Sequence, residues 1–251
     1  MKKPLTILTG ASRGMGLGIA EQLLEAGHHL LCISRKVNES LNALAKKANT
    51  QCEQWPQDLA QALETSERLQ AWLAASDGQA FSSVTLINNA AALPPIAPMA
   101  ALDLAATAQS LRVNIDAPLL LTAAFLRATS SWQVPRKVLN ISSGLGRRAM
   151  AAQAPYCAAK AAMDHFTRCL ALEESASTNG ARVSSLAPGV IDTDMQTYLR
   201  NSNPAQFPDI QSFIGWKAQG MLSSPQEAAR RVIAVLNHAD FGKEPISDVR
   251  G

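Results

Sequence analysis

The sequence has few charged residues for its length, a small net charge and no long apolar run. Charged residues make up 17% of its 251 residues, and the formal net charge is only +3. So small a charge, scattered along the chain, argues against a nucleic-acid partner and against a membrane surface. No stretch approaches the length of a membrane span.

Cysteine and histidine are also scarce. The four cysteines contain no CxxC pair or other metal-ligand spacing, and the four histidines are not clustered, so no metal site is predicted. Unpaired thiols are typical of a reducing compartment, and we expect a cytoplasmic protein. The N-terminal segment MKKPLTILTG starts with two lysines, but its apolar run ends at once in a glycine-rich turn. This argues against a secretory signal.

Apolar segments of strand length alternate with helical patterns from the first residues to about Leu236. The strand-like segments are nearly continuous and uncharged, as in parallel strands that are buried on both faces. The expected strands are Leu5–Thr9, His29–Ser34, Thr50–Trp55, Val84–Asn88, Arg136–Ser142 and Ala181–Ala187. The expected helices are Met15–Ala26, Glu39–Ala48, Leu59–Ala75, Leu102–Thr129, Pro155–Ser177 and Pro225–Asn237. The pattern predicts one α/β domain over residues 1–251, a doubly wound parallel sheet with helices on both faces.

Two features interrupt this alternation. Pro118 lies inside the fourth predicted helix, where it should bend the helix or mark an irregular turn. Residues 193–224 combine prolines and glycines with Phe207, Phe213 and Trp216, which we expect to be exposed. A long irregular connection in a compact domain is commonly a lid or a binding loop, so a substrate lid is predicted here. The alternative is a helical hairpin packed on the core.

The segment LTILTGASRGMGLGIAEQLL has the pattern of a strand, a glycine-rich turn and a helix. Gly10, Gly14 and Gly16 follow a G-x3-G-x-G spacing, which differs from the usual G-x-G-x-x-G of the Rossmann fingerprint. The physical demands are the same: a tight turn, close approach of backbone to a pyrophosphate, and close packing of helix on strand. Such turns also occur in proteins that bind no nucleotide. At the first βα junction of an alternating chain, the turn predicts a Rossmann-type dinucleotide site.

The end of the second strand indicates which dinucleotide binds. An acidic residue there favours the free ribose 2′-hydroxyl of NAD(H), whereas an arginine favours the 2′-phosphate of NADP(H). The chain has Ser34, Arg35 and Lys36 at this point and no acid. Arg35, with help from Ser12, Arg13 or Lys36, could hold the phosphate through charge-assisted hydrogen bonds. NADP(H) is therefore favoured over NAD(H); the alternative is that Arg35 is a solvated strand-end residue.

Tyr156 and Lys160 are four residues apart in APYCAAKAAMDHF, so both side chains project from one face of a helix. An ammonium beside a phenol favours the phenolate, and should lower the pKa of the phenol. Ser143, thirteen positions before Tyr156, could polarise a substrate carbonyl, with Ser142 as the competing hydroxyl. Such a set can exchange a proton with a carbonyl or alcohol oxygen. The alternative is a structural tyrosine and a solvated lysine. Asp164, farther along the helix, is interpreted as a structural or surface group.

Taken in order, these motifs resemble the short-chain dehydrogenase/reductase family. The series consists of TGASRGMG from Thr9, DL at Asp58–Leu59, NNAA from Asn88, Asn114, Ser143, YCAAK from Tyr156 and PGVIDTDM from Pro188. It extends from about residue 5 to about residue 237, and around Arg35 it resembles the sepiapterin/benzil reductase-like branch. The resemblance implies an NADPH-dependent reductase or dehydrogenase. Its small-molecule substrate would be a ketone or aldehyde, of aromatic or dicarbonyl type, interconverted with its alcohol.

The resemblance also implies a role for each matching position. Tyr156 would donate the proton, Lys160 would lower its pKa and hold the nicotinamide ribose, Ser143 would orient the carbonyl, and Asn114 would hold a relay water. These four would be the catalytic residues. The cofactor-binding residues would be Gly10, Ser12, Arg13, Gly14, Met15, Gly16, Ser34, Arg35, Asp58, Leu59, Asn89, Ala90, Tyr156, Lys160, Pro188, Gly189, Ile191 and Thr193.

One position departs from the family pattern. Ala91 stands where the family has glycine, and its methyl group is tolerable if the local φ is negative. Two other functions remain open on the same fold: a non-catalytic cofactor sensor, and an epimerase or dehydratase. Relatives associate through long helices, which implies a homodimer or homotetramer built on the helices that carry Asn114 and Tyr156.

Overall fold

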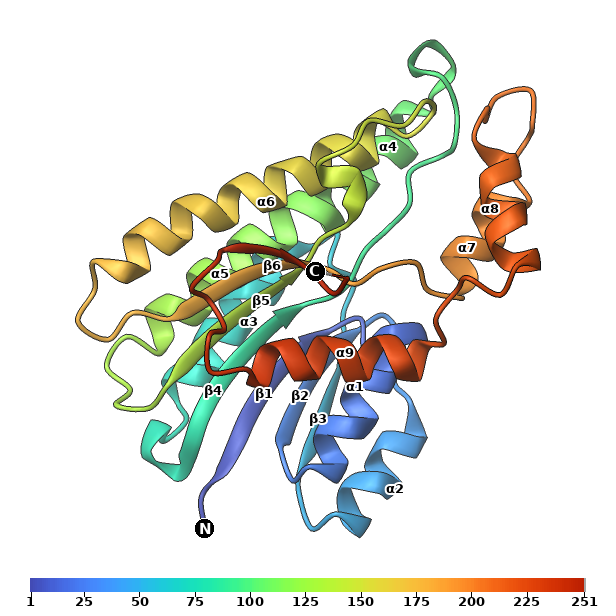
Figure 1. The fold of residues 1–251 in the computed structure, drawn as a ribbon. Helices are drawn as coiled ribbons and strands as arrows, with labels where there is room; N and C mark the ends of the chain where they lie inside the picture. Colours follow the sequence, from blue (N-terminus) through green and yellow to red (C-terminus); the bar gives the residue numbers. More distant parts are fainter. Residues whose placement is uncertain (251) are drawn as a thin grey trace.

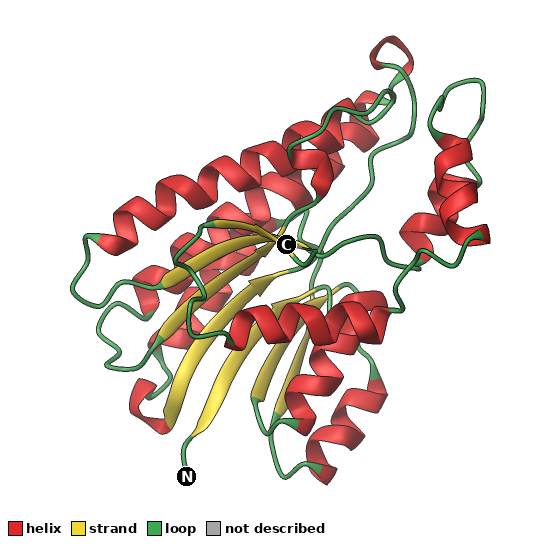
Figure 2. Cartoon of the chain, viewed as in Figure 1, coloured by secondary structure: helices red, strands yellow, loops and turns green. Residues whose placement is uncertain are grey.

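The computed structural model describes residues 1–250 and contains a seven-stranded sheet with helices on both of its faces (Figures 1 and 2). The strand order is β3-β2-β1-β4-β5-β6-β7, and every neighbouring pair is parallel. This confirms the predicted doubly wound sheet. The strands are β1 (Lys3–Thr9), β2 (His29–Ser34), β3 (Cys52–Pro56), β4 (Phe81–Asn88), β5 (Arg136–Ile141), β6 (Arg182–Ala187) and β7 (Ile246–Asp248).

Helices α1, α2 and α9 cover one face of the sheet, and α3, α5 and α6 cover the other (Figure 1). Consecutive side chains of a strand point to opposite faces, so Ile7 packs in one apolar layer and Leu8 in the other. Burial on both faces explains the uninterrupted apolar strands. The α-helices are α1 (Gly14–Glu25), α2 (Glu39–Lys47), α3 (Ala62–Ala74), α4 (Leu104–Leu111), α5 (Ala117–Ala128), α6 (Ala154–Ser175), α7 (Asp194–Arg200), α8 (Ile210–Ala218) and α9 (Pro225–Asn237).

The fourth predicted helix is interrupted, as Pro118 led us to expect. Between α4 and α5, residues 112–116 form a π-helical turn in which the Ala117 N–H bonds to the carbonyl of Arg112, five residues earlier. Proline has no N–H, so Pro118 cannot bond to the Asn114 carbonyl four residues before it. The prediction of an irregular turn is confirmed, and a continuous helix over Leu102–Thr129 is wrong.

The start of the third helix and the number of strands also differ from the sequence prediction. The third helix begins at Ala62 rather than Leu59, because Asp58 closes a turn in which its side chain accepts from the Ala60 N–H at 3.0 Å. The seventh strand, β7, was not predicted. It is an edge strand of three half-buried residues, too short and too mixed in character to produce an apolar run.

The predicted lid, residues 193–224, is a pair of helices rather than an irregular loop. Helices α7 and α8 lie beyond the carboxyl ends of the strands (Figure 1), and a bridge between Ile191 and Ser223 closes their base. The expectation of exposed aromatics is wrong for Phe207 and Phe213, which are 0% and 4% exposed. They belong to a third apolar group, here termed the aromatic cluster: Ile96, Met150, Leu199, Phe207, Ile210 and Phe213. The pair therefore packs on the loops around Ile96 and Met150, away from the two core layers.

The glycine-rich turn after β1 depends on the absence of side chains at two positions. Gly10 has a φ of +71°, in the left-handed region that favours glycine. A Cβ placed on Gly16 would lie 2.0 Å from the Gly10 carbonyl oxygen and 2.5 Å from Asn89 Nδ2. The backbone of the turn and the start of α1 are thus packed directly against each other.

We predict that Gly16→Ala forces this turn apart and lowers the free energy of unfolding by about 1–3 kcal/mol. Gly215→Ala is the matched control, because its Cβ would lie 3.8 Å from the nearest side-chain atom, within helix α8. Alanine there should leave stability unchanged or raise it by about 1 kcal/mol or less. Urea denaturation of both variants measures the difference, and equal stability of the two would contradict the tight packing at Gly16.

Candidate active site

The predicted site residues lie at the carboxyl ends of the central strands. The strand order reverses between β1 and β4, and ligands of open α/β sheets bind in the crevice at such a point. The glycine-rich turn follows β1, and Asn88 and Asn89 end β4. Ser143 follows β5, and Pro188 follows β6. Parallel strands therefore bring segments that are far apart in the sequence to one edge.

The glycine-rich turn and the start of α1 fit a pyrophosphate. Gly10 and Gly14 both have positive φ, at +71° and +56°. Helix α1 has no side-chain cap on its first N–H groups and no acidic residue in its first turn. Unoccupied N–H groups and the helix dipole favour an anion at this position. Met15 is buried in the core layer below the turn, so only its backbone can face the crevice.

Thr9 and Asn89 hold the turn against the end of β4. The Asn89 side chain donates to the Thr9 carbonyl at 2.9 Å, and the backbone N–H groups of Asn89 and Ala90 both donate to Thr9 Oγ1 at 2.9 Å. Asn89 therefore shapes the crevice wall with its side chain. Thr9 was not singled out in the sequence, since a strand threonine carries no signal for this function. The neighbouring Ala91 does not have a positive φ, so its methyl group causes no backbone strain.

The end of β2 presents basic side chains to solvent. Arg35 and Lys36 are exposed, and Arg35 forms no hydrogen bond or ion pair within residues 1–250. Ser34 is buried, and its hydroxyl accepts from the Ala11 N–H at 2.8 Å. Asn38, which sequence reasoning missed, donates to the Ser12 carbonyl at 3.2 Å and so fixes the turn beside Arg35.

The remaining cofactor candidates are divided between the crevice edges. Asp58 is exposed after β3, while the Leu59 side chain is buried in a core layer. On the other side, Gly189 has a φ of +81°, and Thr193 immediately precedes α7. The guanidinium of Arg13 pairs with Asp194 at the start of α7, so this side chain already has an acidic partner.

Tyr156 and Lys160 are both buried on α6, at 7% and 1% exposure. Lys160 Nζ lies 5.7 Å from the centre of the Tyr156 ring, over its face, and donates to the Ile141 carbonyl at 2.7 Å. Ser143 begins the tight turn Gly144–Gly146, and its hydroxyl accepts from the Leu145 N–H at 3.2 Å. Ser143, rather than Ser142, is the hydroxyl that interacts with the Tyr156 phenol.

Burial controls the protonation of this pair. It raises the pKa of Tyr156 to about 12, an effect that the hydrogen bond with Ser143 opposes. It lowers the pKa of Lys160 to about 8, an effect that Asp164 opposes. The expected lowering of the Tyr156 pKa by Lys160 is therefore wrong for this structure. Loss of solvent around the phenolate dominates, and Nζ donates to a main-chain carbonyl.

Asn114 is buried in the π-helical turn between α4 and α5. Its side chain forms a two-bond pair with the backbone of Ala92, accepting from the N–H at 3.1 Å and donating to the carbonyl at 2.6 Å. The side chain therefore anchors the loop after β4. Because proline has no N–H, the Asn114 main-chain carbonyl does not receive the hydrogen bond that the residue four positions later supplies in a regular helix.

A series of hydrogen bonds between buried amide and hydroxyl side chains, here termed the ladder, connects the sheet to α5 and α6. Asn88 Nδ2 donates to Thr122 Oγ1 at 3.1 Å and to Asn140 Oδ1 at 2.8 Å. Asn140 Nδ2 in turn donates to Thr167 Oγ1 at 2.9 Å. Buried amides need such partners, so the ladder fixes β4, β5 and α6 relative to one another. Sequence reasoning missed Asn140, since its role depends on neighbours from other elements.

No group of three or more histidine, cysteine, aspartate or glutamate side chains within residues 1–250 is placed to hold a metal ion. No helix among the described residues is both long enough and apolar enough to cross a membrane.

The chain matches the family model of the short chain dehydrogenases over residues 5–204. Benzil reductase ((S)-benzoin forming) of Bacillus cereus is 33% identical over 235 residues, which cover 94% of this chain and 94% of the relative. Sepiapterin reductase of Xenopus tropicalis is 32% identical, with 94% of this chain and 95% of the relative covered. The crystal structure of the KRED1-Pglu enzyme is similar with a TM-score of 0.78 at 27% identity, covering 96% of this chain and 98% of that chain.

These matches span nearly the whole chain and agree with the parallel sheet and with the crevice at its carboxyl edge. The chain belongs to the short-chain dehydrogenase family, and is thus an oxidoreductase that acts on carbonyl or alcohol groups.

Proposed function

We infer that the protein reduces an aromatic ketone or dicarbonyl compound with NADPH, using Tyr156 as the acid. The buried pair of Tyr156 and Lys160, beside Ser143 and at the same edge as the glycine-rich turn, carries this proposal. An intact acid/base pair also counts against a non-catalytic cofactor sensor. An epimerase or dehydratase would use the same pair, but the similarity to reductases over nearly the whole chain does not favour either.

When bound, NADPH would supply the hydride. The chain's own residues would then manage the proton and the charge on oxygen. A pKa of about 12 keeps the Tyr156 phenol protonated at neutral pH, as a proton donor requires. Ser143 would donate a hydrogen bond to the carbonyl oxygen as negative charge develops there. The Lys160 ammonium would stabilise the phenolate left after the transfer, and the Asn114 carbonyl could hold the water through which the proton is replaced.

The choice of NADPH rests on the end of β2. The family uses both NAD(H) and NADP(H). The free guanidinium of Arg35 and the neighbouring Lys36 would bind a 2′-phosphate, and no carboxylate is present there to bind a 2′-hydroxyl. Arg13 is the third cation near this position, although Asp194 competes for it.

The aromatic cluster supports the substrate class. Leu145, Ala152 and Cys157 pack on this cluster, and the last of these adjoins Tyr156. The rings of Phe213 and Trp216 are 4.9 Å apart, near edge-to-face, so the cluster forms an apolar wall beside the acid. Benzil, an aromatic diketone, is in the name of the relative from Bacillus cereus, and it suits such a wall. In this proposal α7 and α8 act as the substrate lid.

Two further features support the proposed homo-oligomer and the proposed cytoplasmic location. Leu119 and Leu120 on α5 and Leu172 on α6 are exposed, which suits association of these helices in a homodimer or homotetramer. The four cysteines are free thiols, in keeping with a reducing cytoplasm.

Tyr156→Phe removes the proton donor and is expected to lower kcat by about 10²- to 10⁴-fold, with little change in NADPH binding. The chain has one other tyrosine, Tyr198 on α7, which is half exposed. Tyr198→Phe is therefore the matched control and should keep its activity. Steady-state kinetics and NADPH fluorescence titration measure the two effects, and normal turnover by Tyr156→Phe would rule out the assignment.

Arg35→Asp should shift the preference from NADPH towards NADH by about 10- to 100-fold in kcat/KM, because it replaces a charge-assisted contact with repulsion of the phosphate. Lys47→Asp, on the exposed far end of α2, makes the same change of charge away from the turn. The ratio of kcat/KM for the two cofactors is measured in both variants. An unchanged ratio in Arg35→Asp would refute the role of Arg35.

A substrate panel followed by NADPH absorbance should show faster turnover of aromatic diketones, benzil among them, than of small aliphatic diketones. Consumption of one NADPH per product formed would exclude a sensor, an epimerase and a dehydratase. Trp216→Leu should raise KM for the aromatic diketone by about 2- to 10-fold through loss of a ring contact, because Trp216 is the half-buried ring at the side of the aromatic cluster. The aliphatic diketone is the internal control, and equal effects on both substrates would contradict an aromatic substrate wall.

A further inference from the structure

A carboxylate is buried one helical turn beyond Lys160, on the same face of α6. Asp164 is only 2% exposed. Its Oδ1 accepts from the Ser185 hydroxyl at 2.7 Å, and its Oδ2 accepts from Arg147 Nε at 3.1 Å. A buried carboxylate is costly unless it is paired and hydrogen-bonded, and both oxygens here have partners. The Asp164 carboxylate is therefore fixed in one orientation. It is not among the residues of the candidate active site described above.

The buried positive charge of Lys160 requires a negative charge nearby. Its ammonium is almost completely buried, and its close contacts are the Ile141 carbonyl at 2.7 Å and the Met163 sulfur at 4.0 Å. Both contacts are neutral, so neither balances the positive charge. Burial lowers the pKa of Lys160 to about 8, and the negative charge of Asp164 is the influence that raises it. Asp164 thus supplies the compensation that the direct contacts lack.

The packing around Asp164 also includes the segment that carries Ser143. A Cβ on Gly146 would lie 2.9 Å from the Lys160 carbonyl and 3.2 Å from Asp164 Oδ2. The turn that follows Ser143 thus packs directly on α6 at this point. The next residue, Arg147, joins Asp164 to β7 by donating to the Ser247 carbonyl at 2.9 Å. One network therefore joins α6, β6, β7 and the turn after Ser143.

Few other charges lie on the elements that pack against this part of α6. Tyr156 stays neutral at physiological pH because burial raises its pKa to about 12. Asp116, in the π-helical turn, is exposed. Asp248, the last residue of β7, binds Arg250 through both of its carboxylate oxygens, at 2.8 and 2.7 Å. The other basic and carboxylate side chains on these elements and on this part of α6 are exposed to solvent: Arg112, Arg148, His165, Arg168 and Arg182. Arg147 and Asp164 are therefore the charged groups that hydrogen-bond to each other in the packing beside Lys160.

We propose that Asp164, oriented by Ser185 and Arg147, is a positioning residue that keeps the buried Lys160 side chain positively charged beside Tyr156. The inference rests on the proposed acid/base role of Lys160. Asp164 acts only through Lys160 and does not touch the substrate. Arg147 has the opposite effect on the charge, because it neutralises Asp164 and is itself a cation.

The test is the pH dependence of kcat with NADPH. A lysine is charged below its pKa, so wild-type activity should fall as the pH rises through about 8. Asp164→Asn should move this alkaline limb to lower pH by about 1 unit or more, since it removes the opposite charge. Arg147→Gln should move it to higher pH, since it removes a like charge and leaves Asp164 unneutralised. Shifts in opposite directions would not arise from a loss of structure alone.

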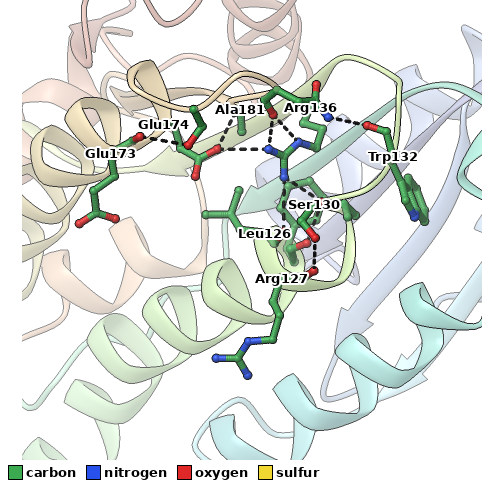
Figure 3. Close-up of polar contacts among 12 residues, drawn as sticks. Leu126, Arg127, Ser130, Trp132, Arg136, Glu173, Glu174 and Ala181 are labelled. Atoms are coloured by element: carbon green, nitrogen blue, oxygen red, sulfur yellow. Dashed lines mark hydrogen bonds and ion pairs between the residues drawn. The ribbon is translucent and has the colours of Figure 1, made fainter.

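Glu174→Gln is the matched control. Glu174 lies near the other end of α6 and is also a largely buried carboxylate paired with an arginine: its Oε2 is 3.4 Å from Arg136 Nη2 (Figure 3). It also accepts from the Ala181 N–H at 2.6 Å. The variant should lower the melting temperature and leave the alkaline limb in place. A shift of that limb in Glu174→Gln equal to that in Asp164→Asn would overturn the proposal.

A second readout does not depend on activity. In protein labelled with ¹³C at the lysine side chains and free of cofactor, NMR titration reports the charge of Lys160, whose signal is assigned by its loss in Lys160→Arg. The midpoint should lie near 8 in the wild type and lower in Asp164→Asn. An unchanged midpoint would overturn the proposal. If Asp164→Asn does not fold, Ser185→Ala decides the question, because it removes the hydrogen bond that orients the Asp164 carboxylate and changes no charge: a downward shift supports the role of Asp164, and an unchanged or higher midpoint overturns it.

The two proposals fail in different ways. If the wild type reduces no carbonyl compound, the proposed function is wrong, whatever the NMR titration shows. If the wild type is active and the Lys160 midpoint does not respond to Asp164, only the role of Asp164 is wrong.

Discussion

Strand β1 lies between β2 and β4 and runs parallel to both, and the position of the candidate site follows from this arrangement. The chain continues from β1 to β2 and β3 on one side of β1, and then crosses to β4 on its other side. The connections that follow β1 and β4 therefore turn away from each other, which opens a crevice at the carboxyl edge of the sheet. The glycine-rich turn occupies the end of β1 inside that crevice. Its backbone fits there because Gly16 lets α1 pack against the Gly10 carbonyl, and because Thr9 and Asn89 fasten the turn to β4.

Several polar and charged side chains are buried near the same edge. Lys160, Asp164 and the Asn88–Asn140–Thr167 ladder are all nearly inaccessible to solvent, and each would be costly without its partners. Because those partners come from different elements, the hydrogen bonds fix α6 relative to β4, β5 and β6. Burial then sets the chemistry: it keeps the Tyr156 phenol protonated, and it makes the charge of Lys160 depend on its surroundings.

The proposed acid/base residues and the aromatic cluster lie in separate parts of the fold. The acid/base residues lie on α6 and on the turn after β5, where the core holds them in place. The aromatic cluster belongs to α7, α8 and two loops, and it packs apart from the two core layers. Two salt bridges from Asp192, to Arg200 and Lys217, stiffen the base of this region.

The sequence alone determined the parallel α/β fold, because strand period, helix period and turn chemistry are local properties that a single segment displays. It also led to the prediction of Gly10, Ser143, Tyr156 and Lys160 as site residues, since their spacing along the chain is itself the signal. Burial was decided only by the tertiary structure. The sequence suggested exposed aromatics at Phe207 and Phe213 and a lowered pKa at Tyr156, and the packing of distant elements reversed both.

The sequence likewise did not reveal which side chains from different elements form hydrogen bonds with each other. Nothing near Asp164 in the chain indicates Ser185 or Arg147, and nothing near Asn140 indicates Asn88. The short edge strand β7 has too few residues to show a period. Local patterns therefore determined which elements form and which groups can do chemistry. The solvation and charge of those groups depend on neighbours that only the folded chain brings together.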